Sequence, residues 1–280
     1  MRYTPVKAEV AFPALRNSYK LAPVKNPRTT LVTGAGRGIG KAIAIALGRA
    51  GYRVGLGSRT KTAVDAVAAE IRKAGGEAFA VLLDVTNPVI LETALGEVRT
   101  KFGPIEILVN NAGTAKSAPI LKTDLELWNE LLTVNLTGTF LCTRAVLPGM
   151  LERGWGRIVN IASTAAKAGG AYISAYSASK HGVLGFTRSV ALEVADKGVT
   201  VNAVCPGYVN TPLTDQNIRN IVAKTGRTEA QAREQILAMN PMNRLIEPEE
   251  VAQLALFLCS EEAAAINGQA INLDGGRLSL

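Results

Sequence analysis

One segment near the N-terminus, residues 33–40 with the sequence TGAGRGIG, restricts the fold of this chain more than any other feature. The β-branched, mostly apolar run Thr29–Thr33 leads into it, and residues 39–50 follow with the composition of a helix. Glycines let the backbone turn tightly and let a phosphate approach it, and the free N–H groups at a helix N-terminus attract an anion. A strand, a glycine-rich loop and a helix in this order predict a βαβ unit that binds a dinucleotide pyrophosphate. A merely flexible turn is the alternative.

The rest of the chain alternates between short β-rich runs and helical stretches, which is typical of a parallel sheet covered on both faces. We therefore predict an α/β fold, a single doubly wound (Rossmann) domain with a seven-stranded parallel sheet. The expected strands are residues 29–33, 53–56, 78–83, 105–110, 157–161, 199–204 and 270–273. The expected helices are residues 39–50, 61–74, 89–102, 125–151, 175–197 and 249–260.

Two segments fall outside this alternation. Residues 1–28 contain four prolines and show no periodicity, so we predict an N-terminal extension before a catalytic domain of residues 29–280. A basic transit peptide is the alternative for this extension. Residues 211–243 are long, polar and partly helical, and they follow the sixth strand. A long excursion at that edge of the sheet predicts a substrate lid.

Composition limits the class of protein and its partners. The 280 residues carry a formal charge of +8, which suits anionic ligands, but the basic residues lack interleaved aromatics, so we expect no nucleic-acid partner. The three cysteines lie far apart and there is one histidine, so we expect no metal site and reduced thiols. No continuous run of about 18 apolar residues occurs, and we expect a cytoplasmic protein without a membrane span.

The end of the second strand indicates which nicotinamide dinucleotide is bound. NAD-binding folds of this kind usually place an acidic residue here to hold the ribose 2′-hydroxyl. This chain has Ser58 and Arg59 instead. Arg59 would pair with a 2′-phosphate, which an acid would repel, and Arg37 of the glycine loop could reach the same group. The pattern predicts NADP(H), with NAD(H) as the alternative if Arg59 is an ordinary solvated residue.

Tyr176 and Lys180 stand at positions i and i+4 of a predicted helix, so they lie on one face of it. A nearby ammonium favours the phenolate and would bring the pKa of the tyrosine from about 10 toward neutrality, which suits acid–base chemistry. Ser163 ends the fifth predicted strand, and only the fold could bring it beside Tyr176. His181 follows Lys180 and points about 100° away around the helix, so we give it no catalytic role.

These motifs together resemble the short-chain dehydrogenase/reductase family, in its classical branch, over residues 29–276. The matching motifs are TGxxxGxG at residues 33–40, NNAG at residues 110–113, Asn135, Ser163, YxxxK at residues 176–180 and Pro206-Gly207. The resemblance implies an oxidoreductase that transfers hydride between a nicotinamide and a carbonyl carbon. It also implies a homotetramer, a dimer of dimers. The helices expected at residues 125–151 and 175–197 could supply its interfaces.

The resemblance also assigns roles to residues. In the catalytic tetrad it implies, Ser163 binds the substrate oxygen, Tyr176 transfers the proton, Lys180 binds the nicotinamide ribose and tunes Tyr176, and Asn135 holds a water in a proton relay. The expected cofactor-binding residues are Gly34, Arg37, Gly38, Ile39, Gly40, Ser58, Arg59, Asp84, Val85, Asn111, Ala112, Gly113, Tyr176, Lys180, Pro206, Gly207, Val209 and Thr211.

The substrate is a small carbonyl compound or the corresponding alcohol. Residues 164–173 and 211–243 should line its pocket, and the small residues of the first segment suit an acyl, cyclic or aromatic ketone. The chain is similar to 3-oxoacyl-thioester reductases and 3-hydroxybutyrate dehydrogenases. Ala165 and Ile173 stand where the latter need polar residues for a free carboxylate. We therefore favour a 3-oxoacyl thioester, with Arg219, Lys224 and Arg227 meeting phosphates of its carrier or forming a plain solvated surface. A hydroxy-acid dehydrogenase and a non-catalytic NADP(H)-binding regulator are the alternatives.

Overall fold

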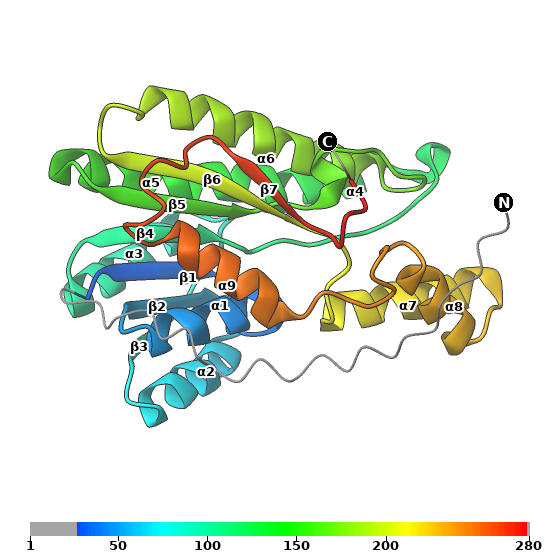
Figure 1. The fold of residues 1–280 in the computed structure, drawn as a ribbon, viewed down its shortest axis with the longest axis horizontal. Helices are drawn as coiled ribbons and strands as arrows, with labels where there is room; N and C mark the ends of the chain where they lie inside the picture. The colour runs from blue at the N-terminus through cyan, green and yellow to red at the C-terminus, as the bar shows by residue number, and fades with distance from the viewer. Residues whose placement is uncertain (1–26, 279–280) are drawn as a thin grey trace, which may run out of the picture.

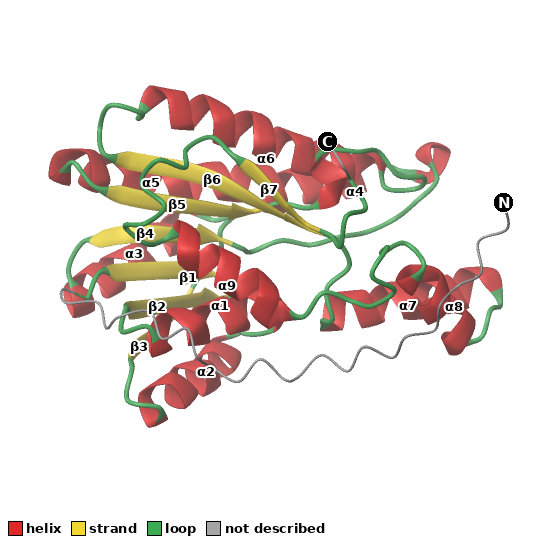
Figure 2. Ribbon diagram, in the orientation of Figure 1, coloured by secondary structure: helices red, strands yellow, loops and turns green. Residues whose placement is uncertain are grey.

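A computed structural model describes residues 27–278 of the chain, so most of the predicted N-terminal extension lies outside the described residues. Seven parallel strands form one sheet in the order β3-β2-β1-β4-β5-β6-β7 (Figures 1 and 2). They are β1 (Thr29–Thr33), β2 (Arg53–Ser58), β3 (Glu77–Leu82), β4 (Ile105–Asn110), β5 (Gly156–Ile161), β6 (Val199–Pro206) and β7 (Ala270–Leu273). The doubly wound fold predicted from the sequence is confirmed.

Helices cover both faces of the sheet (Figure 1). On one face α1 (Gly38–Arg49), α2 (Lys61–Lys73) and α9 (Pro248–Leu258) pack around Ile43, Leu47 and Leu56. On the other face α3 (Pro88–Phe102), α5 (Gly138–Arg153) and α6 (Ser174–Glu193) pack around Leu95, Leu108 and Met150. Apolar side chains on both sides of the central strands explain why those strands read as nearly continuous apolar runs.

Local chemistry explains where several helices begin. Asn87 accepts hydrogen bonds from the first amides of α3, and Asp124 does the same for α4 (Leu125–Leu132). Pro248 occupies the first turn of α9, as the sequence predicted. The predicted helix 125–151 is interrupted, because a π-helical turn, Thr133–Thr137, separates α4 from α5. The predicted helix 175–197 ends earlier, at Glu193, and Gly198 with φ +70° turns the chain into β6.

The strand order predicts a crevice at the carboxyl ends of the central strands. The chain winds outward from β1 through β2 to β3, then returns to β4 on the other side of β1. The loops that leave β1 and β4 therefore diverge to opposite faces, and ligands of doubly wound sheets bind between such loops. The predicted lid forms α7 (Pro212–Thr225) and α8 (Glu229–Leu237), which stand beyond the tip of β6 (Figure 1).

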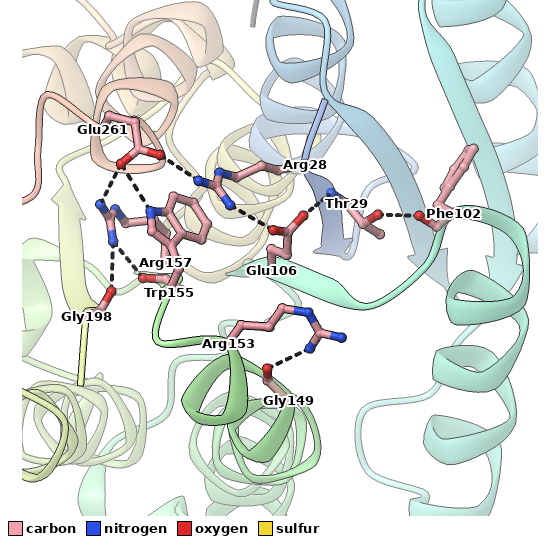
Figure 3. A network of polar contacts seen from close by, with 11 residues as sticks. Arg28, Thr29, Phe102, Glu106, Gly149, Arg153, Trp155, Arg157, Gly198 and Glu261 are labelled. Carbon is pink, nitrogen blue, oxygen red and sulfur yellow. Dashed lines mark hydrogen bonds and ion pairs between the residues drawn. The ribbon is translucent and has the colours of Figure 1, made fainter. Parts of the chain in front are cut away.

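At the amino ends of the strands, opposite the crevice, a polar network joins the beginning of β1 to the chain after α9 (Figure 3). Arg28 pairs with Glu106 and with Glu261, at 2.7 Å in each case. The guanidinium groups of Arg28 and Arg157 lie 3.4 and 4.4 Å from the ring centroid of Trp155. Glu261 accepts a hydrogen bond from the indole N–H and lies 3.6 Å from Arg157, which is 2% exposed. The network supplies the counter-charge for this buried arginine.

Among residues 27–278, one helical segment, Leu125–Arg153, is long and apolar enough to cross a membrane by length and composition alone. Cys142, Val146 and Met150 of this segment lie in the core against the sheet. Core helices of globular domains pass the same test.

Candidate active site

The glycine loop leaves β1 and turns into α1 at the mouth of the crevice. Arg37 caps α1 with extended backbone, but its side chain makes no capping hydrogen bond, and the first turn of α1 holds no acidic residue. Gly34 and Gly38 have positive φ angles of +65° and +54°. A Cβ on Gly40 would overlap the carbonyl oxygen of Gly34. Glycine is required here, because the backbone has positive φ angles and leaves no space for a Cβ at Gly40. The loop therefore fits a pyrophosphate, which the free amides at the N-terminus of α1 would bind.

Asn111 and Thr33 brace the two sides of the crevice against each other. The Asn111 side chain donates to the carbonyls of Thr33, at 3.0 Å, and Gly34, at 3.2 Å. The Thr33 hydroxyl accepts from the amides of Asn111, at 3.0 Å, and Ala112, at 2.9 Å. The NNAG segment after β4 is thus tied to the glycine loop after β1, and these two predicted cofactor-binding segments adjoin one another. Ile39, in the first turn of α1, packs against the core.

The predicted 2′-phosphate site also lies beside the glycine loop. A Cβ on Gly36 would come within 3.7 Å of the Ser58 hydroxyl, so the end of β2 and the loop are neighbours. Arg37 and Arg59 are both exposed. Asp84 follows β3 and accepts two hydrogen bonds from Thr86. Partial burial raises the pKa of Asp84, but these bonds and the charge of Arg59 outweigh it and hold the pKa below its ordinary value.

The remaining predicted cofactor contacts close the crevice from other sides. Val85 is buried against Gly138. The Gly207 N–H donates to the main-chain carbonyl of Leu273 in β7, and the buried Val209 forms a parallel β-bridge with Ile246. The Thr211 methyl lies 3.3 Å from where a Cβ on Gly38 would stand, so the chain after β6 crosses over to the glycine loop.

Ser163 follows β5 in extended backbone, and its Oγ accepts the amide hydrogen of Ala165 at 3.1 Å. The hydroxyl keeps its own O–H free to donate to another group. The Ser163 hydroxyl lies close enough to the Tyr176 phenol to lower its pKa. The structure thus brings together the serine from β5 and the tyrosine from α6, which are 13 residues apart in the sequence.

Lys180 lies one turn after Tyr176, with its Nζ 6.0 Å from the centroid of the tyrosine ring. The ammonium is 6% exposed and donates to the carbonyl of Ile161 at 2.9 Å. That contact uses one of its three N–H groups, and the others can serve a ribose or a water.

The direction of the pKa of Tyr176 differs from the sequence prediction. Burial raises the pKa above its ordinary value, the neighbouring Ser163 hydroxyl lowers it, and the nearby Tyr208 and Cys205 raise it. Lys180 is not among the groups that set this direction; burial lowers its own pKa to about 8, so it still carries its charge at neutral pH. A tyrosine with a raised pKa is protonated at neutral pH, and it is then a proton donor rather than a base.

Asn135 lies in the π-helical turn between α4 and α5, 1% exposed. Its Oδ1 accepts from the amide of Thr114 at 2.9 Å, and its Nδ2 donates to the carbonyl of Thr114 and to the Ser179 hydroxyl, both at 3.0 Å. Gly113 separates Asn135 from Lys180, since a Cβ there would lie 3.1 Å from Asn135 Oδ1 and 3.6 Å from Lys180 Nζ. All four predicted catalytic residues therefore gather at one end of the crevice.

Other predicted features are placed as follows. His181 is exposed and bonds the carbonyl of Ser177. The three cysteines are buried free thiols. Of the basic residues on the predicted lid, Arg219 bonds Gln216 and Lys224 bonds the carbonyl of Ser117, which follows β4. Arg227 bonds Gln235.

Comparison with known proteins agrees with this geometry. The family model described as "short chain dehydrogenase" matches residues 28–221. The chain belongs to the short-chain dehydrogenase family. This membership confirms the family resemblance and the oxidoreductase class predicted from the sequence.

Two curated relatives of this short-chain dehydrogenase are named as reductases. A 3-oxoacyl-[acyl-carrier-protein] reductase of Synechocystis sp. is 45% identical over 89% of this chain and 96% of its own length. A putative ketoacyl reductase of Streptomyces coelicolor is 42% identical over 90% and 97%. A D-beta-hydroxybutyrate dehydrogenase of Rhizobium meliloti is 40% identical over 89% and 98%.

Among solved structures, a variant of actinorhodin polyketide ketoreductase with NADPH superposes with a TM-score of 0.88. It is 41% identical to this chain, and the match covers 91% of this chain and 98% of that one. The proteins similar to this short-chain dehydrogenase thus include both reductases and a dehydrogenase.

The structure adds three residues that the sequence analysis did not single out. Thr33 braces the NNAG segment, Thr114 holds the amide of Asn135, and Ser179 connects Asn135 to α6. Ser179 lies inside the YxxxK motif, so its helical position three residues after Tyr176 was the available signal. The Thr33 hydroxyl contacts main-chain amides of a distant segment, and Thr114 uses its own main chain to hold the Asn135 side chain. No sequence pattern indicates either contact.

Proposed function

We propose that this short-chain dehydrogenase is an NADP(H)-dependent ketoreductase that reduces a ketone to a secondary alcohol. The observation that carries the proposal is the meeting of Ser163, Tyr176 and Lys180 beside the glycine loop. The named reductases among its relatives and the ketoreductase solved with NADPH support the same activity and cofactor. Ser58 and Arg59 beside the loop support a 2′-phosphate.

The chain's own groups account for the proton side of the reaction. When bound, the reduced nicotinamide supplies a hydride to the carbonyl carbon. The Ser163 hydroxyl donates a hydrogen bond to the carbonyl oxygen, where negative charge develops. Tyr176, protonated because of its raised pKa, gives its phenolic proton to that oxygen. Lys180 stabilises the resulting tyrosinate and holds the ribose, and Asn135 orients the groups that return a proton from solvent.

The raised pKa of Tyr176 keeps the phenol protonated, which is the form with which reduction begins. Reduction needs a tyrosine that holds its proton, whereas oxidation of an alcohol needs the tyrosinate as base. In the protein without cofactor, the tyrosinate is disfavoured by burial. Because the same tyrosine would accept the proton in the reverse reaction, substrate and cofactor assays separate a reductase from the secondary-alcohol or hydroxy-acid dehydrogenase considered from the sequence.

The preferred substrate is a 3-oxoacyl thioester. Ala165 and Ile173, on the loop beside Ser163, offer no charge to a free carboxylate. The names of the two reductases among the relatives specify a ketoacyl substrate and a 3-oxoacyl group on an acyl-carrier protein. The helices α7 and α8 would form the lid, with Arg219 and Lys224 exposed on α7 and Arg227 exposed in the turn that follows it. We further propose a cytoplasmic homotetramer that uses the surfaces of α4–α5 and α6.

A panel of ketones tests the proposal directly. The purified protein is assayed for loss of NADPH or NADH absorbance with a 3-oxoacyl thioester, the matching free 3-oxo acid and a bicyclic ketone. We expect the thioester with NADPH to give the largest kcat/KM. Faster turnover of the free acid with NADH would favour the hydroxy-acid dehydrogenase. Turnover of none of them, with tight NADPH binding, would favour the non-catalytic regulator.

A further inference from the structure

The hydroxyl of Ser179 links two parts of the site that come from different layers of the fold. It accepts a hydrogen bond from Asn135 Nδ2 at 3.0 Å and donates one to the main-chain carbonyl of Tyr176 at 2.7 Å. Ser179 is 0% exposed and Asn135 is 1% exposed. The bridge therefore runs from the π-helical turn between α4 and α5 to the first turn of α6, and no water competes for it.

Both ends of this hydrogen-bonded bridge are anchored to other parts of the fold. The Asn135 amide is held at its oxygen by the amide of Thr114 and at its nitrogen by the carbonyl of Thr114. Since Thr114 follows Gly113 directly, this end of the bridge is anchored to the loop after β4. The other end is the carbonyl of Tyr176, in the same helical turn as the Lys180 main chain.

We propose that Ser179 is a positioning residue, whose hydroxyl sets the distance between the first turn of α6 and Asn135 and so places Tyr176 and Lys180 against Ser163. Ser179 touches neither substrate nor cofactor in this arrangement. The inference rests on the proposed ketoreductase function, because it concerns the placement of the residues that carry out that function.

The same motif contains a matched control. Ser177 lies two residues earlier on α6 and is buried, but its Oγ has no hydrogen-bond partner among residues 27–278. Removing the Ser177 hydroxyl changes the size of a buried side chain by the same amount and breaks no bond across layers. The comparison of Ser179→Ala with Ser177→Ala thus separates the bridge from the packing of α6.

The experiment measures kcat, KM, the melting temperature, the affinity for NADPH and the pH profile of kcat/KM for four variants, namely Ser179→Ala, Ser179→Thr, Ser177→Ala and Tyr176→Phe. For Ser179→Ala we expect kcat to fall about 10-fold, because a misplaced reacting group slows the chemical step. NADPH affinity should change less than about 3-fold. The alkaline fall of kcat/KM should move to higher pH, because loosened packing lets water reach Lys180. Ser179→Thr keeps a hydroxyl and should recover most of kcat, and Ser177→Ala should retain kcat within about 2-fold.

A double-mutant cycle with Asn135→Ala tests the bridge itself. If Ser179 acts through Asn135, the double variant should be no slower than Asn135→Ala alone by more than about 2-fold. A wild-type kcat and pH profile in Ser179→Ala, or equal losses in Ser179→Ala and Ser177→Ala, would overturn the proposal. The fourth variant, Tyr176→Phe, tests the underlying function: if it turned over normally the ketoreductase chemistry would fail, whatever Ser179 does.

Discussion

The side-chain nitrogen of Asn111 occupies the space next to Gly40 that a Cβ atom would need. Asn111 comes from the loop after β4, and Gly40 from the first turn of α1. Their close approach lets Asn111 bond the carbonyls of Thr33 and Gly34, which fixes the course of the glycine loop. The glycine spacing and the NNAG segment are therefore two halves of one structure.

Replacing Gly40 by alanine should break this structure. The added methyl would overlap both the Asn111 amide and the Gly34 carbonyl. We expect a loss of stability of about 1–3 kcal/mol from overpacking, together with at least about 10-fold weaker NADPH binding. Gly96→Ala is the matched control, because a Cβ there meets nothing within 4 Å on helix α3, and it should be neutral or slightly stabilising. Thermal unfolding and NADPH titration measure both, and tight NADPH binding by Gly40→Ala would contradict the prediction.

Tyr176→Phe should abolish most of the activity while leaving the cofactor site intact. Loss of a general acid typically reduces kcat by about 10²–10⁴-fold. NADPH affinity, measured by fluorescence titration, should change little because the ring and Lys180 remain. Normal turnover by Tyr176→Phe would mean that another group delivers the proton.

Arg59→Ala should reduce the preference for NADPH over NADH. Loss of one charge-assisted hydrogen bond to a 2′-phosphate costs about 1.5–3 kcal/mol, or about 10- to 100-fold in kcat/KM for NADPH. The value for NADH should stay unchanged, because it lacks that phosphate. Arg53→Ala, at the other end of β2 beside Glu77, serves as control. An equal loss with both cofactors would show that Arg59 does not contact the phosphate.

Lys180 should give the reductase an alkaline limit. Burial lowers its pKa from 10.5 to about 8, so it loses its positive charge as pH rises through about 8. We expect kcat/KM for ketone reduction to be level near neutral pH and to fall above that value. Lys180→Arg keeps its charge and should move the fall to higher pH if it retains activity. A profile for the wild type that stays level well above pH 8 would contradict the assignment.

The same buried charge should cost stability. The folded pKa of Lys180 lies below the unfolded value, so between about pH 8 and 10.5 the unfolded chain binds the proton more tightly and stability rises with pH. Below that window the full cost, about 3 kcal/mol, is present. Lys180→Met should therefore stabilise the fold near neutral pH by about 2 kcal/mol, after the lost bond to Ile161 is included. Denaturant unfolding measures this, and a less stable Lys180→Met would contradict it.

Glu261→Gln should weaken the polar network around Arg157 at the amino ends of the strands. Arg157 is 2% exposed and would lose its carboxylate neighbour, so we expect a loss of about 1–2 kcal/mol in stability. Partial burial raises the pKa of Glu261, but the bonds from Trp155 and Arg28 outweigh it and lower the pKa. Its contribution is present above the unfolded pKa and disappears as pH falls through the folded pKa. The variant and the wild type should thus converge in acid, whereas the exposed Glu193→Gln should match the wild type throughout.

Most of the fold could be predicted because its signals are local. Alternation of β-rich and helical runs identified all seven strands, and the glycine loop identified the β1–α1 turn. The boundaries that differed depend on tertiary contacts. The π-helical turn at residues 133–137 is one example, since an amphipathic pattern does not distinguish it from continuous helix.

The predicted site residues were found by motif, but their chemistry depended on environment. The sequence shows that Tyr176 and Lys180 share a helical face, and from this we predicted a lowered pKa for the tyrosine. Burial acts on both groups at once and reverses that direction, and burial is a property of the packed site rather than of spacing.

By itself, the sequence determined the fold class, the family and the residue types available for hydride and proton transfer. It could do so because turn, helix and strand preferences act over a few neighbouring residues. Only the tertiary structure decided that Asn111 closes the glycine loop, that Ser179 joins Asn135 to Tyr176, and that Tyr176 holds its proton. These outcomes depend on contacts between segments 44 to 78 residues apart and on exclusion of water, which no local pattern records.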